Sequence, residues 1–268
     1  MGRDARRPSA ATVEAARAGR RDAMDTLLAE SLPLVHNVVG RALHGRADAD
    51  ETVEEAMLHI EHGLDTLHDP AAFHGWLAAI AMRQVRDRWR ARQDLPLFAL
   101  ADEAGSDFVD LTILCLGLSG QRAELARATR WLEPEDRDVL SLWWLETTGE
   151  LTRTELAAAC GLTSQHATVR VQRMKARLDA ARSVVRALSA VPGCPLLMDL
   201  VRHWDRQPAP HWRKRVARHT RECPLCERQW HDMRSVEGLL VGLGLVPPPA
   251  EFTERFSLRR RPQLSPQP

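Results

Sequence analysis

Three residues near the C-terminal end of the chain have the types and the spacing of metal ligands. His219 and Cys223 are four residues apart, which places them on one face of a helix, and Cys226 follows in a Cys-Pro-Leu-Cys turn. Thiolates and imidazole are the ligands that Zn(II) prefers, usually in a tetrahedral set of four. The spacing therefore predicts one bound zinc ion, with every position filled by protein and none open for catalysis.

A fourth ligand must come from elsewhere in the chain. Cys194, 25 residues before His219, is the best candidate, and His203 and His211 are the alternatives. The odd total of five cysteines argues against a disulfide framework. The two cysteines left over are expected to be core thiols, Cys115 and Cys160. The zinc ion either holds the fold together or responds to oxidants, because disulfide formation removes its ligands.

An arginine-rich segment from Phe73 to Arg92 also has a composition that can do chemistry. Its apolar spacing predicts a helix whose outer face carries arginines and an indole, namely Arg83, Arg86, Trp89 and Arg90. Arginines neutralise phosphates and an indole stacks on an unpaired base, so this face suits single-stranded or melting DNA. The alternative interpretation is a solvated charged face with Trp76 and Trp89 in the core.

A helix-turn-helix is indicated between Leu151 and Leu178. Gly161 supplies the left-handed turn, and Thr163 or Ser164 caps the second helix. The buried stripe of that helix is predicted from spacings of four, three and four residues: Ala167, Val171, Met174 and Leu178. The opposite face can reach a DNA major groove with Gln165, His166, Thr168, Val169, Arg170, Gln172 and Arg173.

The charges are sorted by segment although they nearly cancel in total. The chain has 37 basic and 36 acidic residues, a formal net charge of +1. Six carboxylates and no basic residue lie between Asp48 and Glu61, whereas Arg83 to Arg92 holds five arginines. Seven basic residues lie between Arg202 and Arg221. They can pair with the acidic residues between Asp94 and Asp110 or touch DNA, and the sequence favours neither.

Apolar residues recur at spacings of three and four along most of the chain, which predicts an all-α protein. Proline and glycine breaks divide it into a helical domain (1–93), an acidic linker (94–121), a helix-turn-helix domain (122–188), a small helical zinc-binding domain (189–245) and a disordered tail (246–268). No apolar run is long enough to span a bilayer, and the start lacks a signal peptide, so a cytoplasmic protein without membrane contact is expected. No catalytic motif is present, so the chain is not expected to be an enzyme.

The order of motifs in the first domain resembles region 2 of bacterial sigma-70 family factors of the small, extracytoplasmic-function type. The likeness runs from about Ala15 to Arg92 and includes the acidic stretch after Arg46 and the segment Leu67-His-Asp-Pro-Ala-Ala-Phe-His-Gly-Trp-Leu. The resemblance implies docking on RNA polymerase through Asp48, Asp50, Glu51, Glu54 and Glu55. It implies opening of the promoter -10 element by Phe73, His74, Trp76, Arg83, Arg86, Trp89 and Arg90.

The helix-turn-helix, from about Glu124 to Arg182, resembles region 4 of the same family. That resemblance implies recognition of the -35 element, with Ser164 added to the DNA-reading face. The pattern Cys194...His219-x3-Cys223-x2-Cys226, followed by a helix to about Leu243, resembles the zinc-binding anti-sigma domain. Its fusion in cis suggests self-regulation, in which the C-terminal domain can contact the sigma domains within one chain.

The function implied is a sigma factor that binds core RNA polymerase and promoter DNA and directs transcription initiation. The rival hypothesis is a zinc-binding, redox-responsive regulator, or an anti-sigma-type interaction protein, that does not act with polymerase. The acidic face between Asp48 and Glu55 discriminates between them, because a simple repressor does not need it.

Overall fold

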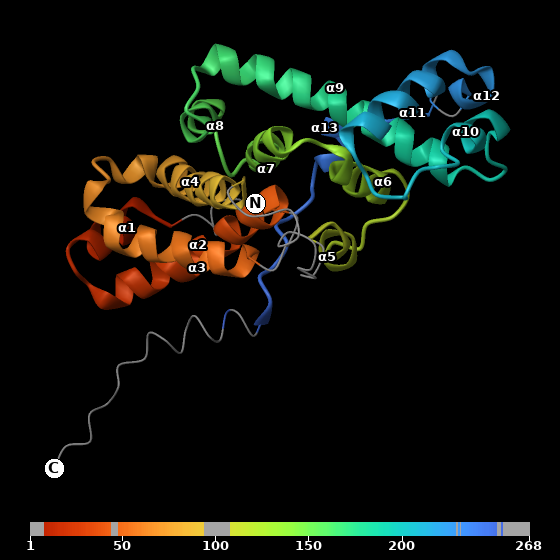
Figure 1. Cartoon of the computed structure of the whole chain (residues 1–268). Helices are drawn as coiled ribbons and strands as arrows, with labels where there is room; N and C mark the ends of the chain where they lie inside the picture. Colours follow the sequence, from red (N-terminus) through yellow and green to blue (C-terminus); the bar gives the residue numbers. More distant parts are fainter. Residues whose placement is uncertain are drawn as a thin grey trace.

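The chain folds into helices joined by short turns, as the apolar spacing predicts (Figure 1). The structure is a computed structural model that describes residues 8–43, 48–93, 108–228, 230, 232–250 and 253. No β-strand occurs within these ranges. None of the described helices is long and apolar enough to cross a membrane.

The first group of helices comprises α1 (Ala10–Arg17), α2 (Arg21–Leu43), α3 (Ala49–Gly63) and α4 (Phe73–Gln93). Val53, Met57 and Ile60 of α3 are at most 1% exposed, because their spacing turns all three toward α2 and α4. Two 3₁₀ turns, Leu64–Thr66 and Pro70–Ala72, connect α3 to α4. The second half of α2 is buried throughout, including the polar residues Asn37 and Arg41.

The second group comprises α5 (Phe108–Cys115), α6 (Gly120–Ala128), α7 (Pro134–Thr148), α8 (Arg153–Cys160) and α9 (Ser164–Ser189). Gly161 ends α8 with a φ of 68°, and the Thr163 side chain caps α9 by accepting from the His166 N–H. All four residues of the predicted apolar stripe of α9 are at most 1% exposed. The predicted left-handed turn, helix cap and buried stripe are therefore confirmed.

The third group comprises α10 (Pro195–Leu200), α11 (Pro210–Glu222), α12 (Pro224–Glu227) and α13 (Val236–Leu240). The helix predicted after Cys226, to about Leu243, is present only as the short α13, which ends at Leu240. The chain instead leaves the helix after Glu227 and starts again at Val236, where the Ser235 side chain accepts from the Gly238 N–H as a cap.

The three groups pack on one another through long-range helix contacts. Helix α7 lies on α2, α8 lies on α4, and α11 lies on the second half of α9. After α13 the chain crosses back to α2, where Val246 is 1% exposed. The disordered tail is predicted to begin at Val246, which is too early, because Val246 is held by hydrogen bonds to Asn37.

Candidate functional site

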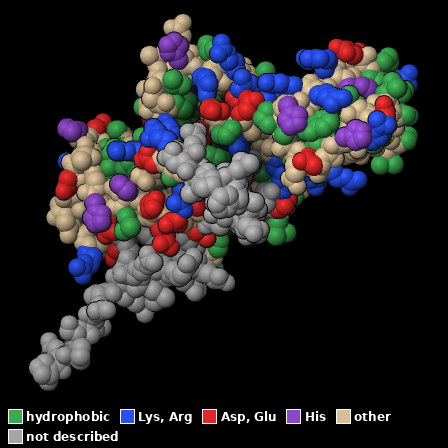
Figure 2. Space-filling model, in the orientation of Figure 1, with side chains coloured by type: hydrophobic (Ala, Val, Ile, Leu, Met, Phe, Trp, Pro, Cys, Tyr) green, Lys and Arg blue, Asp and Glu red, His purple; other side chains and the backbone are tan. Residues whose placement is uncertain are grey.

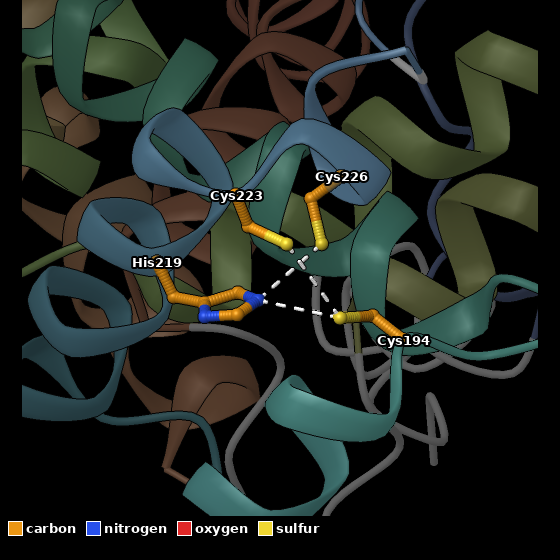
Figure 3. Close-up of side chains that lie close together, drawn as sticks. All are labelled: Cys194, His219, Cys223 and Cys226. Atoms are coloured by element: carbon orange, nitrogen blue, oxygen red, sulfur yellow. Dashed lines mark hydrogen bonds between the residues drawn. The ribbon is translucent and has the colours of Figure 1, made fainter.

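Four side chains from three separate segments converge at the far end of α9 (Figure 3). Cys194 is the residue before α10, and His219 lies in the last turn of α11. Cys223 is the residue before α12, and Cys226 lies within α12. Their ligand atoms all lie within 4.8 Å of one another. The structure thus brings Cys194 to the three residues of the local motif, while the alternatives His203 and His211 lie outside the group and are exposed.

Three of the six distances between these atoms match the edges of a tetrahedral zinc site. The Nε2 of His219 is 3.6 Å from the Cys194 sulfur and 3.5 Å from the Cys226 sulfur, and the Cys194 and Cys223 sulfurs are 3.8 Å apart. With Zn–S bonds of about 2.3 Å and Zn–N bonds of about 2.05 Å, a tetrahedron has S···S edges of about 3.8 Å and S···N edges of about 3.6 Å. The three cysteines are buried, so a bound ion is screened from water.

The other two cysteines lie far from this group. Cys160 is half-buried, and burial raises the pKa of its thiol to about 11. Cys115, at the end of α5, is exposed, so the prediction of a core thiol there is wrong. Neither residue belongs to the group that can hold a metal.

The predicted DNA-opening helix, α4, is covered along much of its length by α8. Arg86 donates from Nη1 to the backbone oxygen of Ala159 at 3.2 Å. Gly75 lies so close to α8 that an added Cβ would be 2.7 Å from the Cγ of Glu155. The predicted DNA-opening helix therefore lies against the first helix of the predicted helix-turn-helix.

Only some of the predicted opening residues of α4 are accessible. Phe73 and His74 are buried, and Trp76 is half-buried against the core. The prediction that Trp89 projects outward is wrong, because it is half-buried with the Arg137 guanidinium 5.4 Å from its ring centre. Arg83 and Arg90 are exposed, and Arg86 is half-buried.

The predicted DNA-reading face of α9 is open, in contrast to that of α4. Ser164, Gln165, His166, Thr168 and Arg173 are exposed, and Arg170 is half-buried. Basic side chains follow the edge of the molecule along α9 and α11 (Figure 2). Of the basic residues in α11, Arg213 points inward and donates to the Trp131 backbone oxygen at 2.5 Å, while Lys214, Arg215, Arg218 and Arg221 are exposed.

The predicted polymerase-docking acids on α3 fall into two kinds. Asp50 and Glu51 are exposed, and Glu54 and Glu55 are half-buried. Asp48 is buried and accepts from the Nε of Arg88 at 2.9 Å, and Arg88 also pairs with Glu51. Asp48 therefore fixes α3 against α4. Sequence reasoning missed Arg88, because it was one of five arginines in its segment and nothing marked its direction.

A buried polar junction joins the first two groups of helices. The Arg41 guanidinium lies 4.0 Å from the ring centre of Trp144 in α7 and 5.6 Å from that of Phe108 in α5. Its Nη1 donates to the Oδ1 of Asn37 at 2.7 Å, and burial lowers the pKa of Arg41 to about 9. An arginine and an asparagine inside the apolar run of α2 were the signal in the sequence that could have marked this junction.

The third group is fixed to the second by a polar network around Arg182. This arginine is fully buried in the second half of α9 and donates to the Arg234 backbone oxygen at 2.8 Å and to Gln121 at 3.1 Å. Gln121 in turn donates to the Asp232 backbone oxygen at 2.7 Å. The segment between α12 and α13 is therefore fixed to α6 and α9.

Residues 27–94 match the family Sigma-70 region 2. The match covers most of α2 and all of α3 and α4, so the helices that carry the acidic face and the arginine-rich face form a sigma-70 region 2 domain. The match supports a sigma factor of the sigma-70 family, and factors of that family regulate transcription together with core RNA polymerase and promoter DNA. No curated protein and no solved structure shows a significant match to the chain.

Proposed function

We propose that the chain is a sigma factor of the extracytoplasmic-function type, regulated in cis by a C-terminal zinc-binding domain of the anti-sigma kind. The observation that carries the proposal is the region 2 match followed, in the expected order, by a helix-turn-helix whose reading face is exposed. In this role the chain acts in the cytoplasm, where the polymerase is.

Each exposed surface then has a distinct task. The acidic face of α3 docks on core RNA polymerase through Asp50, Glu51, Glu54 and Glu55. The N-terminal half of α9 reads the -35 element, because its glutamine, histidine and arginine side chains reach base edges and phosphates in a major groove. Helix α4 opens the -10 element after it separates from α8, which releases Arg86.

The Cys3His group is proposed to hold one zinc ion, supported by the agreement of its interatomic distances with a tetrahedron. Zinc supplies four bonds that tie the ends of α10, α11 and α12 together. These helices have six, 13 and four residues, too few for stable helices of their own, so the ion sets the shape of the region that packs on α9.

The proposed regulation is that the C-terminal region favours the closed arrangement in which α8 covers α4. It packs on the same helix, α9, that carries the DNA-reading face, and it reaches α2 through Val246. The chain in this arrangement presents its polymerase-docking and -35 surfaces while its -10 surface is covered. Opening is then a step that follows docking on the polymerase.

Transcription with purified core polymerase tests the function. The full-length chain is expected to form a complex with core enzyme and to produce run-off transcripts from promoters selected from its own genome. If no complex forms and none of the selected promoters is transcribed, the proposal is overturned.

A zinc-dependent DNA-binding regulator without polymerase is the second candidate. One observation favours it: the DNA-reading face of α9 is exposed, whereas α4, which would open the promoter, is covered. Replacing Asp50 and Glu55 by Lys distinguishes the two functions, because these side chains have no task in a simple repressor. Loss of core binding with unchanged duplex DNA binding supports the sigma factor, provided that the matched exposed change Glu222→Lys leaves core binding intact.

A further inference from the structure

The segment 241–249, which we call the strap, is a second connection between the region 2 domain and the helix-turn-helix domain. It begins beside α6, where the Val241 backbone oxygen accepts from Arg122 at 3.0 Å. It ends beside α2, where the Asn37 amide donates to the Val246 backbone oxygen at 2.7 Å and accepts from the Val246 N–H at 2.9 Å. The two partners are 209 residues apart in the chain.

The near end of the strap is held firmly. Helix α13, which precedes it, buries Val236, Leu239 and Leu240 against α6 and α7. Glu237 pairs with Lys175 of α9. The strap is therefore anchored on the helix-turn-helix side, and only its far end can leave without unfolding that domain.

The far end of the strap meets the junction that holds the two domains together. The Asn37 Oδ1 accepts from both the Val246 N–H and the Arg41 guanidinium, and Arg41 lies against Trp144 of α7. Departure of Val246 takes away one of the two donors of a buried oxygen and uncovers the side of Asn37 that faces the strap. The same departure therefore weakens the contact between α2 and α7.

The strap fills its place on α2 only in part. A cavity of about 310 Å³ lies between it and the region 2 domain, lined by Leu34, His74 and Leu77 on one side and by Leu245, Pro247 and Pro248 on the other. The far end is held by the two bonds to Asn37, by the buried side chain of Val246 and by Leu245, which packs against the core. A contact this small can be released by a competing partner.

We propose that the pairing of Val246 with Asn37 is an autoinhibitory latch: while it is closed, α8 stays on α4, and its release opens the chain. This rests on the proposed function for its biological meaning, although the latch itself is a property of the fold. The latch adds a defined trigger, the far end of the strap, to the self-regulation suggested by domain fusion.

Substitution within the full-length chain tests the latch. Val246→Asp places a charge in the buried position beside Asn37, and Pro249→Asp, at an exposed position of the same strap, is the matched control. A second pair of chains ends after Gly244 or after Pro249, which removes or keeps Val246. Small-angle scattering measures compactness, and a fluorescent single-stranded oligonucleotide measures access to α4.

Loss of two buried hydrogen bonds is expected to raise the open population, and hence the affinity for the oligonucleotide, about 30-fold. Val246→Asp and the chain ending after Gly244 should show a larger radius of gyration and this tighter binding, whereas both controls behave as the native chain. Native compactness and affinity in Val246→Asp and in the Gly244 chain would overturn the latch. Opening of these variants, in a protein that never binds core polymerase, would uphold the latch and reject the proposed function.

Discussion

Replacement of Cys226 by Ser is expected to weaken zinc binding and loosen the C-terminal region. The Cys226 sulfur is buried and lies 3.5 Å from the His219 Nε2. Serine at this position leaves the other three ligands in place and replaces the thiolate by a hydroxyl, which is a weaker ligand for zinc. Structural zinc sites of four ligands bind with roughly 10–16 kcal/mol at neutral pH. One quarter of this is about 3 kcal/mol, so the affinity should fall roughly 100-fold or more.

The assay is zinc content by mass spectrometry, followed by transfer of zinc to a chelator of known affinity. Protein purified under reducing conditions should hold about one zinc per chain, and Cys226→Ser should hold clearly less. Cys160→Ser is the matched control, because this half-buried thiol lies outside the metal-binding group and its replacement should leave the zinc content unchanged.

Loss of the ion should also be visible in the fold. Helices α10 and α12 have six and four residues, so they should lose protection from hydrogen exchange together with the end of α11. Native protein that contains no metal, or a Cys226→Ser chain with full zinc content and unchanged exchange, would refute the reasoning from the interatomic distances.

Two further predictions concern stability. Burial raises the pKa of Asp138 from 3.8 to about 6, so its contribution to stability is full below about pH 4 and is lost as the pH rises through 6. Asp138→Asn should therefore be more stable than the native chain at pH 8, by at most about 3 kcal/mol in denaturant melts. The difference in stability should shrink below pH 6. Equal stabilities of the two chains at all pH values would contradict this. Gly40→Ala places a Cβ 2.2 Å from the Phe108 ring and should cost about 1–3 kcal/mol. The control is Gly63→Ala, whose added Cβ would lie in ordinary contact with Trp76 at 3.5 Å. Unchanged melting of Gly40→Ala would show that Phe108 moves freely.

Local features of the fold and the site could be predicted because they depend on near neighbours. The left-handed Gly161, the Thr163 cap and the stripe of α9 follow from spacing within one helix-turn-helix. His219, Cys223 and Cys226 are close in sequence, so the end of a single helix and the turn after it bring them together. Cys194 was identified by residue type and confirmed as the fourth member of the group by the fold.

Features set by contacts between distant segments could not be predicted in this way. Helix α4 has an inner face against α2 and α3 and a second covered face under α8, and a single apolar period cannot indicate both. The predicted outward position of Trp89 is instead covered by the Arg137 guanidinium of α7. The pairing of Val246 with Asn37 joins residues 209 positions apart, so the proline-rich composition after Val246 suggested only a tail.

Because the strap is part of the same chain as its binding site, a weak contact is enough to hold it there. A tethered segment meets its site at an effective concentration on the order of millimolar, whatever the number of protein copies in the cell. Two hydrogen bonds and one valine side chain can hold the closed form under these conditions, although they would not hold two separate molecules together. The balance between closed and open chains is then unaffected by dilution as the cell grows, and only a ligand or partner that prefers one form can shift it.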